Sequence, residues 1–512
     1  MRTKIALATL CWDAGLPAEG QAWAEGARDD ARALFPPEHP LGLIADSHLA
    51  EFLLLAGRDG EAIEILLECL AGETLLTDRL IDGHSDLADL GAMRAAMAQL
   101  DLATLAVLRA RAIGPDVAMR LTEGRLRFGG SGAALLAARR RGQNPPRDLG
   151  RALLEGSGFA GSSVVAATTL FQESGVLRRA LALWTDSGCT LHDLGPAGEM
   201  DRALSEWSRA PWRPAGEAVE PLVDLLDSHS GSHSRLFWFP DNALALVPLA
   251  AMFTRRHRPI VERFAVVQSR DAYAALASAP PSDGGALLVG IGEFRDGAGR
   301  DLEKPLPSVY EEIASLARIY PDAVMLLDTA ATADALALAL ESRPGIVHIA
   351  THGLSEARGE GLSRLRRVLG RAATDDPLQR SAIVLSGEAD SERLLTARDL
   401  AQRDLESVRL FVLAACDSGV GLNDAAEGSL GFQAALHHAG VATILCSLWP
   451  IGDSEAPMLM SEFHRSVLAG APPSVALQTA QLAAFRRGDN PVTWGGFILS
   501  GLDQPLIMDQ AK

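Results

Sequence analysis

The spacing of apolar residues changes once along the chain, near residue 163. Over residues 1–140, apolar positions recur at the three- and four-residue spacing of amphipathic helices. Beyond residue 163, apolar runs such as SRLFWFP, GALLVGIG and VRLFVLAA alternate with helical segments. Uninterrupted apolar strands that alternate with helices are typical of a parallel sheet covered by helices on both faces. The pattern therefore predicts an α/β fold with a mostly parallel sheet, preceded by an all-α helical-repeat domain.

The helical region repeats with a period of 42 residues, which places Ala14 on Ala56 and Gly15 on Gly57. Each copy predicts two amphipathic helices joined at a turn of small residues, where antiparallel helices can pack closely. The second copy, ADSHLAEFLLLAGRDGEAIEIL, resembles a tetratricopeptide repeat, and a degenerate third copy falls at 92–112. A helical bundle without repeats is the alternative.

The overall charge limits the classes of partner. The 512 residues include 47 Lys and Arg against 65 Asp and Glu, a formal charge of −18. A surface of this sign repels phosphate backbones, which argues against direct nucleic-acid binding. No run reaches the ~20 apolar residues that a membrane-spanning helix needs. We therefore expect a protein that binds neither nucleic acid nor membrane.

The cysteines are few, scattered and odd in number. They contain no CxxC pair, which argues against a disulfide framework or a zinc site and favours a reducing compartment. The apolar run at 5–12 is short for a signal peptide and stops at Asp13. A cytoplasmic location is therefore predicted. The five cysteines are Cys11, Cys69, Cys189, Cys416 and Cys446.

Two apolar strands end in side chains that can act together chemically. The run 346–351 is followed by His352 and Gly353, and the run 410–415 is followed by Cys416. If the two strands are parallel neighbours, both side chains lie at the sheet edge where active sites form. An imidazole favours the thiolate form of a nearby thiol, and a thiolate attacks amide carbonyls. The pair therefore predicts a cysteine peptidase with His352 and Cys416 as its dyad.

Residues 165–505 resemble the CHAT domains, which are caspase-like peptidases attached to tetratricopeptide repeats and related to caspases and separase. The resemblance covers about two-thirds of the chain and departs from the family at Ala414, where serine is common; we expect no functional loss from this. The matching pieces follow in family order: LFWFPDNALALVPLAAM, ALLVGIGEF, IVHIATHG, RLFVLAACDSG and EGSLGFQAALHHAGVATILCSLWPIGD.

The resemblance implies a caspase-like fold with His352 as general base and acid and Cys416 as nucleophile. It also implies an oxyanion site made of the Gly353 and Cys416 amides, and no metal or organic cofactor. By analogy with the family, the predicted function is a regulated cysteine endopeptidase that cleaves a protein substrate in bacterial defence or signalling. A protein activator or partner is expected to bind the N-terminal repeats.

These patterns also predict a domain organisation. A tetratricopeptide-like domain is expected over 1–145, and the Pro- and Gly-containing stretch RGQNPPRDLG predicts a linker over 146–162. The peptidase domain is expected over 163–512. Its N-terminal part, 163–280, is predicted to be pseudo-catalytic, and its catalytic part is predicted at 281–505.

Specificity is expected to depend on Asp453. This residue follows the strand VATILCSLW, whose carboxyl end should meet the same cleft. A carboxylate in a binding pocket pairs with Arg through charge-assisted bonds. The block SLWPIGD resembles the closing block of separase, in which the acid recognises Arg. We therefore expect cleavage after a basic or neutral residue, with Arg favoured and Asp disfavoured. The alternative is that Asp453 only caps the next helix.

Several alternatives and structural interpretations accompany these predictions. The Arg- and Gly-rich segment at 354–380 reads either as a gate that the enzyme itself cuts or as a solvated insertion. A non-catalytic interaction scaffold that retains the peptidase fold is the rival function, and a serine α/β hydrolase is disfavoured because no suitable GxSxG motif occurs. Structural roles are expected for His348, Glu427, Trp449 and Cys446.

Overall fold

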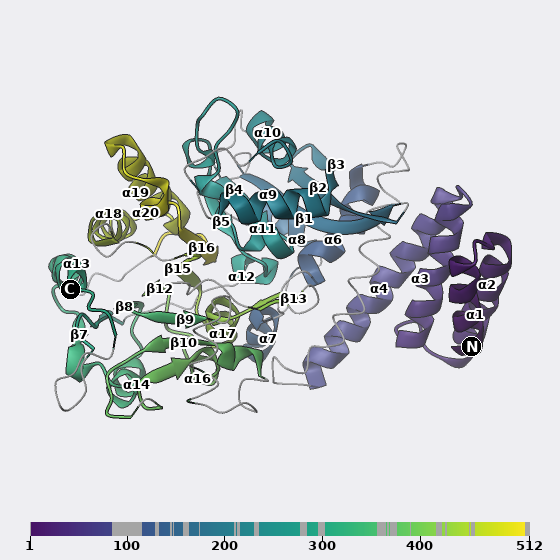
Figure 1. Ribbon diagram of the computed structural model, residues 1–512. Coiled ribbons are helices and arrows are strands. Elements are labelled where there is room, and N and C mark those ends of the chain that lie inside the picture. Colours follow the sequence, from purple (N-terminus) through teal and green to yellow (C-terminus); the bar gives the residue numbers. More distant parts are fainter. Residues whose placement is uncertain are drawn as a thin grey trace.

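The computed structural model describes residues 2–83, 115–128, 133–143, 146, 148–156, 163–173, 175–208, 211, 216–229, 235–276, 284–294, 303–355, 365, 368, 376–389, 391–415, 422–424, 428–449, 451 and 456–506. Four helices begin the chain and stand beside the sheets of the remaining protein (Figure 1). They are α1 (Arg2–Asp13), α2 (Pro17–Leu34), α3 (Pro40–Leu55) and α4 (Asp59–Gly83).

The first four helices form two consecutive hairpins with equivalent turns. Gly15 joins α1 to α2 with φ = 70°, and Gly57 joins α3 to α4 with φ = 73°. Glycine adopts this left-handed conformation without steric cost, so the two turns explain the 42-residue period. The four helices share a core of their own, which includes Leu49, Phe52 and Leu66. The predicted third copy at 92–112 lies outside the described residues, and the tetratricopeptide character of the region stays a prediction.

Three further helices connect this helical unit to the first sheet. Leu121 of α6 packs in the core of the first helices, and Leu126 of the same helix packs in the main core. Part of the stretch predicted as a linker is helical, and its Leu149 and Leu153 are fully buried. The prolines of RGQNPPRDLG precede this helix, and its apolar residues share one face. The three helices are α6 (Pro115–Phe128), α7 (Ala133–Arg140) and α8 (Leu149–Gly156).

The first sheet has five strands in the order β3-β2-β1-β4-β5. A two-residue turn links β2 to β3, as the Asp186-Ser187-Gly188 signal predicted, and β1, β4 and β5 run parallel. The strands are β1 (Ser163–Glu173), β2 (Val176–Thr185), β3 (Gly188–Pro196), β4 (Arg235–Phe239) and β5 (Ala265–Gln268). The helices between and after them are α9 (Ala197–Trp207), α10 (Glu220–Ser228), α11 (Asn242–Ala245) and α12 (Ala272–Leu276), with short 3₁₀ turns η2 (Leu249–Ala251) and η3 (Ile260–Glu262).

The second sheet has six strands in the order β16-β15-β12-β8-β6-β7, and all neighbouring pairs are parallel except β15 with β16. Figure 1 shows α18 and α19 above this sheet and α14 and α16 below it. The strands are β6 (Ala286–Gly290), β7 (Val324–Leu327), β8 (Ile346–Thr351), β12 (Leu410–Ala415), β15 (Thr443–Ser447) and β16 (Phe497–Gly501). The helices are α13 (Ser308–Ile319), α14 (Ala333–Glu341), α16 (Ala397–Ala401), α17 (Phe432–His438), α18 (Ala456–Leu468), α19 (Pro473–Arg487) and α20 (Pro491–Trp494).

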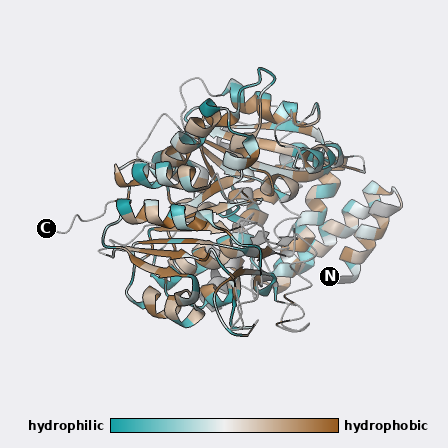
Figure 2. Cartoon of the chain, turned by 60° about the vertical axis from the view of Figure 1, so that its left-hand side comes forward, coloured by the Kyte–Doolittle hydropathy of each residue, from teal (hydrophilic) through white to brown (hydrophobic). Residues whose placement is uncertain are grey.

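Short strands lie near the carboxyl ends of β8 and β12. β9 (Gly353–Ser355), β10 (Ser381–Val384) and β11 (Leu394–Thr396) form a three-stranded sheet, while β13 (Leu422–Asp424) pairs with β14 (Gly428–Leu430). Two 3₁₀ turns, η4 (Asp328–Ala330) and η6 (Pro377–Arg380), complete the elements. Figure 2 shows the strands of the larger sheets as predominantly hydrophobic and the covering helices as amphipathic. The predicted α/β fold with a mostly parallel sheet behind a helical region is thereby confirmed.

Candidate active site

The two strands that precede the predicted dyad are direct neighbours. β8 and β12 pair in parallel, and the last pair of their register joins Thr351 to Ala415. The next residue in β8 is His352, and the next residue after β12 is Cys416. Cys416 itself lies outside the described residues. The register therefore ends both strands at the same edge of the sheet, where active sites form in parallel sheets.

The imidazole of His352 is held by a backbone carbonyl and an aromatic ring. Its Nε2 lies 2.7 Å from the carbonyl oxygen of Lys304, and the ring of Phe294 lies 4.8 Å away between centroids. Because a carbonyl oxygen only accepts hydrogen bonds, Nε2 carries the proton and Nδ1 is left as the basic nitrogen. Sequence reasoning missed both contacts. A contact with a backbone carbonyl cannot be predicted from residue types, since every residue has a backbone carbonyl.

The backbone around His352 is fixed by the small sheet. The amide of Val384 donates to the carbonyl of His352 at 2.9 Å. Hydrogen-bonded and non-hydrogen-bonded pairs alternate in an antiparallel ladder, so the next pair, Gly353 with Ile383, is of the non-hydrogen-bonded kind. The amide of Gly353 therefore points away from β10. Because β9 is an outer strand of this sheet, the amide points towards the sheet's outer edge.

Three of the five thiols are buried away from any role as nucleophile. Burial raises the pKa of Cys189 and of Cys446 to about 12, and it also raises the pKa of Cys69. A thiol with a raised pKa carries little thiolate at neutral pH. Cys446 lies fully buried within β15, in agreement with its expected inert role. Cys11 is partly exposed in α1.

A buried chain of hydrogen bonds connects His348 of β8 to the helices that cover this strand. His348 contacts Glu312 at 2.8 Å through Nε2 and His464 at 3.2 Å through Nδ1, and Tyr320 contacts Nδ1 of His464 at 3.0 Å. Every contact is satisfied if Tyr320 donates to His464, His464 donates to His348, and His348 donates to Glu312. Burial, with the neighbouring His348, holds the pKa of His464 well below its usual range, which keeps that ring neutral. His348 thus has structural partners, as predicted.

The third strand at this edge is β15. It pairs in parallel with β12, and the hydroxyl of Ser447 donates to the carbonyl of Ala415 at 2.8 Å. Trp449 is buried, and its Nε1 donates to the carbonyl of Val492 at 2.8 Å, which agrees with its expected core role. Asp453 lies outside the described residues, as does Glu427. The next described helix, α18, begins at Ala456.

Two features were sought among the described residues: a metal-binding group and a membrane-spanning helix. Within those ranges, no group of His, Cys, Asp or Glu is arranged to bind a metal ion. Likewise, none of the described helices has the length and apolar character to cross a bilayer.

The geometry defines a class of α/β protein in which a histidine and a cysteine follow neighbouring parallel strands at one edge of a sheet. The family model of the CHAT domain matches residues 212–502, more than half of the 512 residues. The chain therefore belongs to the CHAT domain family, as its motifs indicated. No curated protein sequence matches the chain.

Solved structures of low sequence identity resemble parts of the chain. The Arg-specific cysteine proteinase gingipain R matches with 12% identity and a TM-score of 0.38, covering 61% of this chain and 75% of that one. Separase of Saccharomyces cerevisiae, solved in complex with securin, matches with 8% identity and a TM-score of 0.49, covering 87% of this chain and 37% of that one. Family membership rests on the CHAT match and not on these distant similarities.

Proposed function

We propose that this protein is a regulated cysteine endopeptidase that hydrolyses peptide bonds of a protein substrate through Cys416 and His352. The observation that carries the proposal is the register of β8 with β12, which pairs Thr351 with Ala415 immediately before the two residues. The orientation of His352 adds support, because its contact with Lys304 leaves Nδ1 to accept a proton. Three other thiols are buried, which leaves Cys416 and the partly exposed Cys11 as candidates for the nucleophile.

The reaction would proceed through an acyl-enzyme. Nδ1 of His352 takes the proton of the Cys416 thiol, and the thiolate attacks the carbonyl carbon of the scissile bond. The oxyanion accepts hydrogen bonds from the amides of Gly353 and Cys416. The direction of the Gly353 amide, away from β10, suits this role. The imidazolium then gives its proton to the leaving amine, and a water molecule activated by His352 hydrolyses the thioester.

The dyad is tested by cleavage of a peptide library. Cys416→Ala and His352→Ala should each lower kcat/KM by at least about a thousandfold, because neither half of a dyad acts well alone. Cys11→Ala is the matched control, since it removes a partly exposed thiol and should leave turnover unchanged. Full turnover by Cys416→Ala would refute the assignment. Should both dyad variants and the wild type be equally inactive on every substrate, a non-catalytic scaffold would be the better account.

The proposed specificity is for a basic residue, Arg above all, before the scissile bond. It rests on the carboxylate of Asp453, which follows β15 in the sequence. The strand β15 pairs with β12. Removing one partner of a desolvated charge pair costs about 2–5 kcal/mol. Asp453→Asn should therefore reduce cleavage after Arg by a factor of roughly thirty or more, while cleavage of a matched peptide with Gln in that position changes little. An unchanged preference for Arg, or a library profile dominated by Asp, would contradict this specificity.

The same proposal includes a regulatory role for the N-terminal helices. They have a core of their own and project beside the sheets, so they can offer a surface to a protein activator or partner (Figure 1). A cytoplasmic location and a role as a proteolytic switch in bacterial defence or signalling belong to the proposal by analogy with the family.

A further inference from the structure

The two groups that contact the imidazole of His352 come from the two ends of one stretch of chain, between β6 and α13. Phe294 lies just after β6, and Lys304 lies just before α13. The two ends are joined directly, since the amide of Leu306 donates to the carbonyl of Gly292 at 2.9 Å. The position of the imidazole therefore depends on how the backbone at Gly292 is held.

The side chain of Asp328 holds this backbone. The residue follows β7, which is the outer strand beside β6. Its Oδ1 accepts hydrogen bonds from the amides of Gly292 at 3.0 Å and Glu293 at 3.3 Å, and its Oδ2 accepts one from the hydroxyl of Tyr310 at 2.9 Å. One carboxylate thus connects the ends of β6 and β7 with α13. The two amide contacts fix the direction in which the chain leaves β6 towards Phe294.

The backbone at this junction is unusual at two positions. Asp328 has φ = 43°, a left-handed conformation that glycine adopts without steric cost and other residues adopt at a cost. At Gly292, an added Cβ would lie 2.6 Å from the ring of Tyr310, so the two segments approach as closely as a glycine permits. A glycine at 328 would suit the turn by itself. The hydrogen bonds to the end of β6 are therefore what the aspartate adds.

We propose that Asp328 is a positioning residue for His352. Its carboxylate fixes the end of β6, and thereby the Phe294 ring and the Lys304 carbonyl that orient the imidazole. Asp328 acts through the backbone and not on the reacting atoms. The inference rests on the proposed function, because the orientation of the imidazole affects turnover only if His352 is the base.

The first test reads the tautomer of His352 without any turnover. The ¹⁵N shifts of the imidazole are measured by NMR in the full chain carrying Cys416→Ala, and the signal is assigned by its loss when His352→Gln is added. With Asp328 in place, the Lys304 carbonyl keeps the proton on Nε2, so the two nitrogens of the neutral ring have well-separated shifts. Asp328→Gly should move the two shifts towards each other, because both tautomers become populated. Asp328→Asn should keep them apart, since an amide oxygen still accepts from the two backbone amides.

The second test is peptide cleavage by the same variants with Cys416 restored. Asp328→Gly should lower kcat about tenfold and leave KM nearly unchanged, because a misaligned base slows the chemical step and not substrate binding. Glycine suits the left-handed backbone, so this variant is expected to fold. Asp328→Asn should restore kcat to within about twofold of the wild type.

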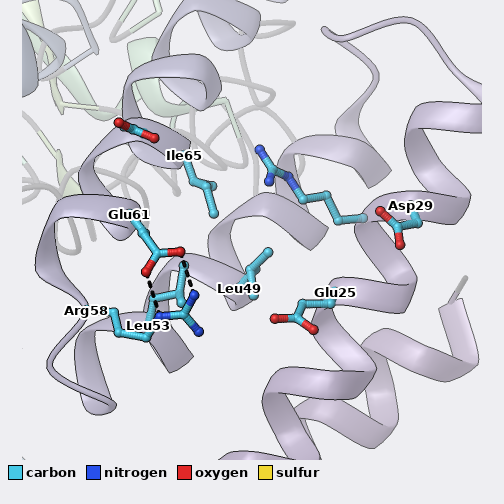
Figure 3. A pocket seen from close by; sticks show the side chains of 9 residues that line it. Glu25, Asp29, Leu49, Leu53, Arg58, Glu61 and Ile65 are labelled. Carbon is cyan, nitrogen blue, oxygen red and sulfur yellow. Dashed lines mark hydrogen bonds and ion pairs between the residues drawn. The ribbon is translucent and has the colours of Figure 1, made fainter.

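Two controls separate this role from a general effect of relaxed backbone or of a lost carboxylate. His257→Gly relaxes another left-handed residue, with φ = 55°, in the turn between η2 and η3. Glu61→Ala removes a carboxylate that accepts a hydrogen bond from Arg58 on the N-terminal helices (Figure 3). Both variants should leave the tautomer of His352 and kcat unchanged.

Unchanged ¹⁵N shifts in Asp328→Gly would overturn the proposal, and so would effects of the same size in Asp328→Asn or in either control. Cleavage by the wild type that Asp328→Gly does not slow would refute this role and leave the proposed peptidase standing. Conversely, a chain that cleaves no peptide, but in which the tautomer of His352 responds to Asp328→Gly, would refute the peptidase and leave the positioning of the imidazole standing.

Discussion

At the scale of single residues, the candidate site depends on how His352 is oriented. The Lys304 carbonyl fixes which ring nitrogen carries the proton, and the ring of Phe294 limits how the imidazole can turn. Phe294 is itself buried, so its position is set by the core and not by solvent. The face of an aromatic ring also stabilises a nearby cation. We therefore expect Phe294 to act as a positioning residue for the imidazole.

Replacing Phe294 tests this role. Phe294→Leu should lower kcat about tenfold and leave KM nearly unchanged, because cation–π contacts contribute ~0.5–2 kcal/mol and the ring contacts His352 in the free protein. Phe463→Leu is the matched control: it truncates a fully buried aromatic residue of α18 that packs beside His464. It should lower stability without lowering kcat of the folded protein. Equal kcat losses in both variants would mean that the effect is structural.

Some residues of the site could be predicted from the sequence and others could not, because only some contacts depend on a particular residue type or spacing. His352 and Cys416 stand at the ends of apolar runs, so the strand pattern was sufficient to select them. The carbonyl of Lys304 comes from a segment that precedes α13, and neither its type nor its spacing marks it. The network of His348 with Glu312 and His464 joins residues that are more than thirty positions apart, so strand alternation could indicate a partner for His348 without identifying it.

At the scale of elements, the sequence predicted best those turns and strands that have a strong local pattern of residues. The glycine turns at Gly15 and Gly57, the Asp186-Ser187 hairpin and the apolar strands all appear where the sequence predicted them. The helix α8 was missed because prolines just before it dominated the interpretation of the segment. The short strands β9, β10 and β11 were missed because three or four residues give too little periodicity to distinguish a strand from a loop.

Two glycines of the second helical hairpin give a matched prediction. Gly57 has φ = 73° at the turn and Gly60 lies within α4, and an added Cβ would meet no atom within 4 Å at either position. Gly57→Ala should destabilise the protein by about 1–2 kcal/mol through backbone strain alone. Gly60→Ala should stabilise it by about 0.5–1 kcal/mol because alanine favours the helix. Thermal unfolding of the two variants would show shifts of opposite sign, and a loss with Gly60→Ala would contradict this account of the turn.

At the scale of the whole molecule, the two large sheets are joined by buried polar contacts. Arg235 at the start of β4 contacts Asp503 beyond β16 at 2.8 Å, and both are almost fully buried. Asp503 also accepts hydrogen bonds from the amide and hydroxyl of Ser474. The hydroxyl of Ser500 meets that of Ser269 at 3.0 Å at the same junction. The sequence could not reveal this junction, since its two contacts between the sheets, Arg235 with Asp503 and Ser269 with Ser500, each join residues more than two hundred positions apart.

Breaking the Arg235–Asp503 pair should destabilise both sheets together. Asp503→Ala leaves a buried guanidinium without this carboxylate and should cost about 3–5 kcal/mol of unfolding free energy. Asp404→Ala removes a carboxylate from the exposed pair with Arg343 and should cost no more than about 1 kcal/mol. Urea unfolding followed by tryptophan fluorescence measures both. A cost for Asp503→Ala that matches the exposed control would show that the pair does not hold the sheets together.

The central claim is that Cys416 is a nucleophile activated by His352, and irreversible labelling tests it most directly. The wild-type chain is treated with an Arg-containing peptide acyloxymethyl ketone, and the modified residue is located by mass spectrometry. We predict one label on Cys416, formed at least about a hundredfold more slowly in His352→Ala. Labelling of Cys11 in preference to Cys416, or labelling of Cys416 at the same rate in His352→Ala, would contradict the account.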